Sequence, residues 1–154
     1  MKGYTFRDYK AENMARAVGI ALPISLKQSV EICSFIENKN VNAAKKILQN
    51  VVEKKFAIPF KRYNWDLGHK KKIGPGRYPE KASKEITKLI ESAEANAQFK
   101  GLNTSNLVIL HISAHKSNKS MHYGRQSRRR MKRTNIEIIV EEKSNSAEKA
   151  EPKK

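Results

Sequence analysis

The segment from His115 to Asn135, HKSNKSMHYGRQSRRRMKRTN, most constrains the fold of this chain. It contains eight lysines and arginines and no acidic residue. A run of alternating apolar and polar residues lies on each side of it, NLVILHISA before and NIEIIVEE after. Such alternation is typical of β-strands, so we predict that the two runs pair as a hairpin. Their connection of about twenty residues is far longer than the two to five residues of ordinary hairpin loops.

This connection cannot stabilise its own fold. An isolated two-stranded hairpin is only marginally stable in water, and ordering each residue costs about 1–2 kcal/mol. The segment offers few large apolar side chains beyond Met121, Tyr123 and Met131, and its cations repel one another. Phosphate groups can offset these costs through direct contacts and counterion release. We therefore interpret residues 115–135 as an RNA-binding arm that becomes ordered on RNA. A solvated charged loop or a localisation signal is the alternative, because basic runs are common in both.

The whole chain is also basic, with a formal net charge of +17 over 154 residues. Nucleic acid is the partner that such a charge favours most. An anionic membrane surface is the second choice, and a merely soluble basic protein is the third. No apolar run approaches the roughly 18 residues of a membrane span, and the first residues lack the apolar core of a signal peptide. We therefore expect a cytoplasmic protein.

Apolar periodicity outside the arm predicts an α+β fold, with three helices against a small antiparallel sheet. We expect Ser25 and Asn42 to cap the first two helices, and Gly101 to end the third. The single cysteine, Cys33, falls in a helical pattern and is predicted to be a small buried hydrophobe. In chain order, the predicted elements are a strand (14–22), two helices (26–39 and 43–56), a helix (79–100) and two strands (107–114 and 134–142).

The last two strands have predicted faces. In the first of them, alternation places Leu107, Ile109, His111 and Ser113 on one face, and Val108, Leu110, Ile112 and Ala114 on the other. In the second, Ile136, Ile138 and Val140 share one face, and Glu137 lies on the other. The polar, low-complexity stretch at 143–154 is expected to be a disordered tail.

The stretch 58–79, IPFKRYNWDLGHKKKIGPGRYP, has no periodicity and is rich in Gly, Pro, aromatic residues and cations. About twenty residues without an element are normally functional or disordered, and the aromatic residues argue against disorder. We interpret this stretch as an RNA-contacting loop. The candidate RNA-binding residues are Lys61, Arg62, Tyr63, Trp65, His69, Lys70, Lys71, Lys72 and Arg77 in the loop, and Lys116, Lys119, His122, Tyr123, Arg125, Arg128, Arg129, Arg130, Lys132 and Arg133 in the arm.

Sequence motifs for catalysis are lacking. GHKKKIGPGR does not match the phosphate-binding Gly-x-x-x-x-Gly-Lys-Ser/Thr loop, and no cysteine accompanies the four histidines at zinc spacing. The acidic residues fall mainly on predicted helix exteriors and in the tail, so none suggests general acid–base chemistry. We expect that the chain is not an enzyme and that it binds no cofactor and no metal ion. The open alternatives are a free nucleic-acid regulator or DNA-compacting protein, favoured by charge alone, and an RNA-modifying or RNA-cleaving enzyme.

Several stretches together resemble the large-subunit ribosomal protein twenty-two family, in its archaeal or eukaryotic version. The most specific is SAEANAQFKGL at 92–102, with the strand that follows it. The resemblance covers about residues 12–142. Its stretches are IPFKRYN (58–64), GRYPEKASKEITKLIESAEANAQFKGL (76–102), LVILHISA (107–114) and, after the arginine-rich segment, IEIIVEE (136–142).

This resemblance implies one domain over residues 1–142, with three helices packed on a three-stranded antiparallel sheet and a long protruding basic β-hairpin. It implies a structural constituent of the large ribosomal subunit that binds 23S-type ribosomal RNA and helps assembly. The body would lie near the peptide exit, and the hairpin at 116–133 would help line the nascent-peptide tunnel. The implied partners are large-subunit ribosomal RNA, neighbouring large-subunit proteins and the nascent polypeptide, with no membrane and no homo-oligomer.

Overall fold

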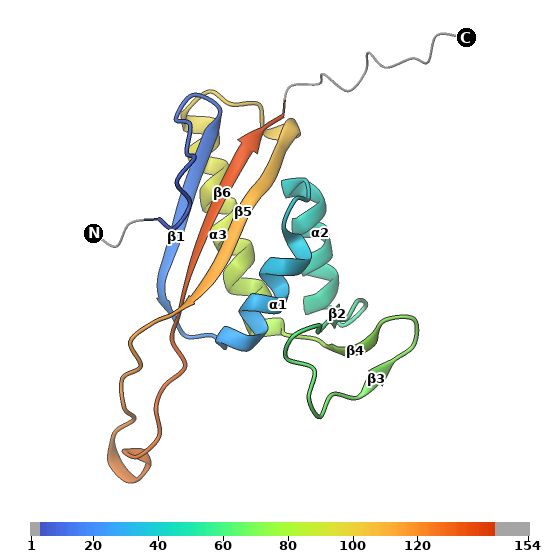
Figure 1. The fold of residues 1–154 in the computed structure, drawn as a ribbon, viewed down its shortest axis with the longest axis vertical. Helices are drawn as coiled ribbons and strands as arrows, with labels where there is room; N and C mark the ends of the chain where they lie inside the picture. The colour runs from blue at the N-terminus through green and yellow to red at the C-terminus, as the bar shows by residue number, and fades with distance from the viewer. Residues whose placement is uncertain (1–3, 144–154) are drawn as a thin grey trace.

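The structure, a computed structural model, describes residues 4–143. One layer is an antiparallel sheet in the order β1-β6-β5, made of β1 (Met14–Leu22), β6 (Thr134–Glu142) and β5 (Leu107–Lys116). Within the described residues there are three α-helices: α1 (Leu26–Ile36), α2 (Val41–Val52) and α3 (Glu80–Phe99). Helix α3 packs on β1 and β6, α1 packs on β5, and α2 packs on α3 (Figure 1). The predicted α+β fold is confirmed.

The core lies between the sheet and the helices. Ile32 and Ile36 on α1 and Ile86 and Ile90 on α3 are fully buried, and each pair has the spacing of one helix face. The small residues Ala93 and Ala97 are also fully buried, which lets α3 approach the sheet closely. Cys33 is in this core, as predicted. From β5 and β6 the core takes Leu107, Ile109, Ile112, Ile136, Ile138 and Val140.

The predicted N-cap of α2 at Asn42 is wrong. Asn40 is the cap, because its side chain accepts a hydrogen bond from the N–H of Asn42 at 2.9 Å. The preceding link pairs with the edge of β5, where the N–H of Ile109 donates to the carbonyl of Lys39 at 2.9 Å. This pairing holds the chain extended up to Asn40, so the helix begins directly after it. Such a contact between distant segments has no signature in the local sequence.

The predicted cap of α1 and the predicted end of α3 hold in position, whereas α1 and α2 end at Ile36 and Val52, before the predicted residues 39 and 56. Ser25 occupies the N-cap of α1, although its side chain makes no capping hydrogen bond. Gly101 follows the C-cap of α3 with φ of +80°, the left-handed conformation that favours glycine.

A β-bulge in β5 contradicts the predicted faces of that strand. The register passes from Ile109 opposite Val140 to His111 opposite Ile139, so Leu110 is an extra residue. Such an insertion reverses the alternation beyond it. Ile112 therefore joins Leu107 and Ile109 in the core, while His111 and Ser113 lie on the other face. In β6 the predicted face of Ile136, Ile138 and Val140 is confirmed.

The stretch 58–79 also differs from the prediction, because it is not without elements. It contains β2 (Ile58–Pro59), β3 (His69–Lys70) and β4 (Gly74–Arg77), which form a small antiparallel sheet in the order β2-β4-β3. Gly76 permits this pairing, since a Cβ there would lie only 3.0 Å from the carbonyl oxygen of Ile58. Strands of two to four residues are too short to show a period in the sequence.

Candidate nucleic-acid interface

The arm, residues 115–135, extends away from the helices and the sheet (Figure 1). Its regular ladder ends where Lys116 pairs with Thr134. Beyond that point the two sides are joined by a few backbone hydrogen bonds, among them those from Met131 to Ser120 and from His122 to Arg129, both 2.8 Å. The tip is a single 3₁₀ turn at Gly124–Gln126. So few bonds leave the arm dependent on external contacts for a fixed shape.

The arm presents its polar and aromatic side chains to the outside. All residues from 121 to 130 are exposed, and Tyr123 is 87% exposed. Among residues 4–143, no acidic side chain forms an ion pair with any of the eight arm cations. Lys119 and Arg133 are half-buried, and the remaining predicted arm residues are exposed: Lys116, His122, Tyr123, Arg125, Arg128, Arg129, Arg130 and Lys132.

The root of the arm is fixed to the end of β1 and to the link that follows it. The guanidinium of Arg133 donates to the carbonyl of Ala21 at 3.1 Å, and the side-chain oxygen of Asn135 accepts from the N–H of Ala21 at 2.8 Å. The buried hydroxyl of Thr134 donates to the carbonyl of Ile24 at 3.0 Å. Arg133, predicted to bind RNA, thus also holds the arm on the body.

The segment 58–79, here called the loop, is held by a buried carboxylate that the sequence analysis missed. Glu31 is 4% exposed and accepts hydrogen bonds from three consecutive backbone N–H groups. These come from Lys61 at 3.0 Å, Arg62 at 2.9 Å and Tyr63 at 2.8 Å. The carboxylate therefore fixes the backbone that carries the first loop cations. No sequence pattern distinguishes Glu31 from the other helical acids.

Around this anchor the loop displays cations beside aromatic rings. Tyr63 is half-buried, with the Lys27 amine 5.6 Å and the Arg62 guanidinium 5.4 Å from its ring centre. Trp65 is 86% exposed, which makes its ring available for stacking. Figure 1 shows the loop and the arm at the same end of the molecule. The other predicted loop residues are exposed on the small sheet and its turns: Lys61, Arg62, His69, Lys70, Lys71, Lys72 and Arg77.

A second buried carboxylate, Glu137, lies on the sheet face away from the helices. It accepts hydrogen bonds from the N–H of Thr5 at 3.1 Å, from the Thr5 hydroxyl, and from His111 Nε2 at 3.0 Å. Burial acts to raise the pKa of Glu137, but these hydrogen bonds outweigh it and hold that pKa below its ordinary value. His115 Nε2 lies 3.6 Å from the same carboxylate. This cluster fastens the N-terminal residues to the sheet.

Metal binding has no support in the part of the chain that the structure describes. There, no three His, Cys, Asp or Glu side chains are grouped so that they could hold a metal ion.

Comparison with known proteins decides the family. The sequence model described as "Ribosomal protein L22p/L17e" matches residues 17–141, which include both the loop and the arm. The chain belongs to this family. The membership confirms the resemblance found in the sequence, and L22p/L17e proteins are ribosomal proteins rather than enzymes.

Archaeal members of the L22p/L17e family are similar over nearly their whole length. The large ribosomal subunit protein uL22 of Archaeoglobus fulgidus is 40% identical over 146 residues, covering 90% of this chain and 94% of the relative. That of Thermoplasma volcanium is 42% identical over 147 residues, covering 92% and 98%. That of Nanoarchaeum equitans is 43% identical over 141 residues, covering 85% and 80%. The chain is thus a large-subunit ribosomal protein of the archaeal type, located in the cytoplasmic ribosome.

A membrane-spanning helix is not found among residues 4–143, since no helix there is both long enough and apolar enough.

Proposed function

We propose that this chain binds 23S-type ribosomal RNA of the large subunit through the arm and the loop, and that it helps the subunit to assemble. One observation carries the proposal: the arm carries eight cations, six of them exposed, and no acidic side chain of residues 4–143 forms an ion pair with any of them. Phosphates neutralise such cations and release counterions, which favours binding. Arginine is the main cation in the second half of the arm, and its side chain can also hold a phosphate through two donors and stack on bases.

The finer assignment is the one that the family resemblance implies, and the extended shape of the arm supports it. A thin element that reaches beyond the body fits between RNA segments, and its exposed tip can line the nascent-peptide tunnel while the body lies near the exit. The partners are then the RNA, neighbouring large-subunit proteins and the nascent polypeptide, and the chain forms no homo-oligomer. Residues 1–142 act as one domain, with 58–79 and 115–135 as its RNA-contacting parts. The predicted disordered tail at 143–154 lies, apart from Lys143, outside the described residues.

Salt-dependent binding tests this function. Replacing Arg128, Arg129 and Arg130 together by Ala should weaken binding to large-subunit ribosomal RNA. It should also lower the slope of log affinity against log salt by about 2 to 3, because each phosphate contact contributes about 0.7–0.9. The thermal unfolding midpoint should not change, since the three side chains are exposed and form no side-chain hydrogen bond or ion pair within residues 4–143.

The matched control replaces the exposed cations Lys81, Lys84 and Lys88 of α3 by Ala, which removes the same charge from the body. We expect the salt dependence of RNA binding by this control variant to stay close to that of the wild type. An equal loss in both variants would mean that charge alone drives binding. Failure of the wild-type chain to co-sediment with large subunits at moderate salt, or equal affinity for duplex DNA, would favour a free nucleic-acid-binding protein.

A further inference from the structure

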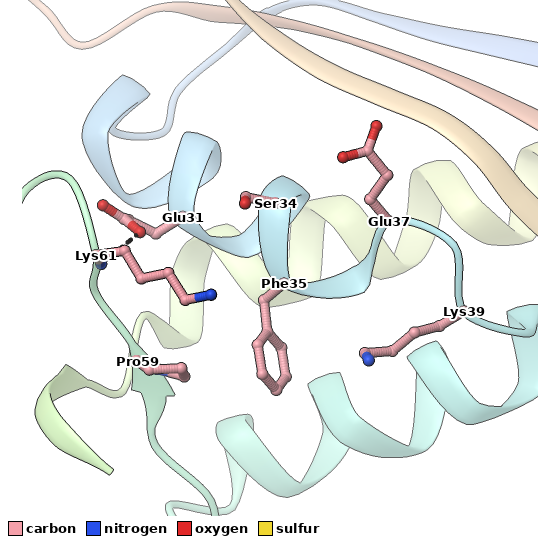
Figure 2. A pocket seen from close by; sticks show the side chains of 7 residues that line it. All are labelled: Glu31, Ser34, Phe35, Glu37, Lys39, Pro59 and Lys61. Carbon is pink, nitrogen blue, oxygen red and sulfur yellow. Dashed lines mark hydrogen bonds between the residues drawn. The ribbon is translucent and has the colours of Figure 1, made fainter.

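A hollow of about 270 Å³ lies between α1 and the start of the small sheet (Figure 2). Only Lys61 among its residues belongs to the candidate RNA-binding set. Figure 2 shows the side chains of Lys61 and Lys39 running toward the ring of Phe35 from either side. The lining residues are Glu31, Ser34, Phe35, Glu37, Lys39, Pro59 and Lys61.

The phenyl ring of Phe35 offers a flat surface in this hollow. The ring is half-buried and packs in a tilted arrangement on Phe56, with the ring centres 5.7 Å apart. The Lys39 amine lies 5.3 Å from the centre of the Phe35 ring. Pro59 supplies a second apolar wall. A half-open aromatic surface of this kind suits a planar ligand, because stacking on it buries apolar area on both partners.

The charge of the hollow favours an anion. Within residues 4–143, neither Lys39 nor Lys61 forms an ion pair with an acidic side chain. The carboxylate of Glu31 is engaged by three backbone N–H groups of the loop. Figure 2 shows Glu37 pointing away from Phe35. Two amines beside one half-buried ring are therefore available to a ligand that combines a flat ring with a negative group.

We propose that this hollow binds one unpaired nucleotide of large-subunit ribosomal RNA, with its base on Phe35 and its phosphate between Lys39 and Lys61. The inference rests on the proposed function, since it adds a nucleotide site to the same interface. The Ser34 hydroxyl at the rim can bond to a ribose 2′-hydroxyl or a base edge. An acidic side chain of a neighbouring protein would satisfy the two amines but would leave the Phe35 ring uncovered, so the nucleotide is the better match.

Cross-linking from position 35 tests the site in assembled particles. The full chain, with photo-reactive benzoylphenylalanine in place of Phe35, is incorporated into large subunits and irradiated. We expect a cross-link to ribosomal RNA that stops reverse transcriptase at one position. Lys39→Gln with Lys61→Gln should abolish that stop, whereas the control pair Lys84→Gln and Lys88→Gln, with the same charge change, should leave it. A cross-link to a ribosomal protein, or no cross-link, would overturn the proposal.

Binding of the full chain to large-subunit ribosomal RNA gives a second readout. Phe35→Leu should weaken binding roughly tenfold, the order expected for one stacked base. Lys39→Gln with Lys61→Gln should lower the slope of log affinity against log salt by about 0.7, because the two lysines together neutralise one phosphate of single-stranded RNA. If circular dichroism shows that Phe35→Leu unfolds the chain, the lysine pair decides alone, because those side chains are not in the core.

The two proposals fail in different ways. If arm variants lose RNA affinity while both hollow variants bind like the wild type, the nucleotide site is wrong and the proposed function stands. If the wild-type chain does not bind the RNA, the proposed function itself is wrong.

Discussion

Replacing Glu31 by Gln tests how the loop is held in place. One oxygen of the Glu31 carboxylate accepts from Arg62 and Tyr63, and the other accepts from Lys61. Gln keeps one carbonyl oxygen and replaces the other by an NH₂ group, which cannot accept a hydrogen bond. If the oxygen stays with Arg62 and Tyr63, the new amide faces the N–H of Lys61, so two donors meet in a site where Glu31 is 4% exposed.

The magnitude follows from these contacts. A hydrogen bond to a charged group contributes about 1.5–3 kcal/mol, and an unsatisfied buried donor costs about 1–3 kcal/mol. The substitution removes one hydrogen bond and weakens the other two, because the acceptor is no longer charged. The neutral side chain also costs less to bury than the carboxylate, which offsets part of this loss of stability. We therefore expect the substitution to destabilise the loop by about 2–4 kcal/mol. At 1.4 kcal/mol for each factor of ten, this corresponds to roughly 30- to 700-fold more frequent opening.

Amide hydrogen exchange at residues 61–63 measures this opening directly, and urea unfolding followed by circular dichroism shows whether the body is destabilised as well. The matched control is Glu37→Gln at the C-cap of the same helix, for which residues 4–143 show no side-chain hydrogen bond. Its effect should stay within about 0.5 kcal/mol, as for most surface substitutions. If the amides of residues 61–63 exchange in the Glu31→Gln variant as slowly as in the wild type, the reasoning is refuted.

Two further predictions concern titratable groups. Because the native pKa of Glu137 lies below its ordinary 4.5, its stabilising contribution should be full above pH 4.5 and lost as pH falls through the native value. Urea unfolding of the wild type and Glu137→Gln between pH 7 and pH 3 should show their difference shrinking at low pH, and a constant difference would contradict this. Burial raises the pKa of the Cys33 thiol to about 12, so a thiol reagent at pH 8 should label Cys33 only in denaturant. Rapid labelling of the native chain would refute the burial, with Cys33→Ala as the unreactive baseline.

The sequence predicted those parts of the fold that local physics determines. Helices α1 and α3 follow from apolar spacing because each buries one continuous face, and Gly101 marks a helix end because only its conformation suits the turn. The bulge at Leu110 and the capping of α2 by Asn40 depend instead on strand pairing between distant segments. Such pairing leaves no trace in a short window of sequence, so both were predicted wrongly.

The same division holds for the candidate interface. Runs of cations such as Arg128 to Arg130 are visible in the sequence because their repulsion excludes them from a core. The role of Glu31 could not be predicted, since a carboxylate on a helix is ordinarily solvated and its partners lie about thirty residues away. The partly open ring of Phe35 could not be predicted either, because it depends on the packing of α1 beside Pro59.

The bonds from residues 133–135 to Ala21 and Ile24 make the end of β1, with the short link to α1, a pivot. At ~3.3 Å per residue, the arm carries its tip roughly 30 Å from that pivot, so a tilt of about 10° would displace the tip by about 5 Å. An inserted or deleted residue near position 22 could therefore misdirect the arginines without altering any of them. The direction in which the arm points is therefore set by a segment that does not itself have to contact RNA.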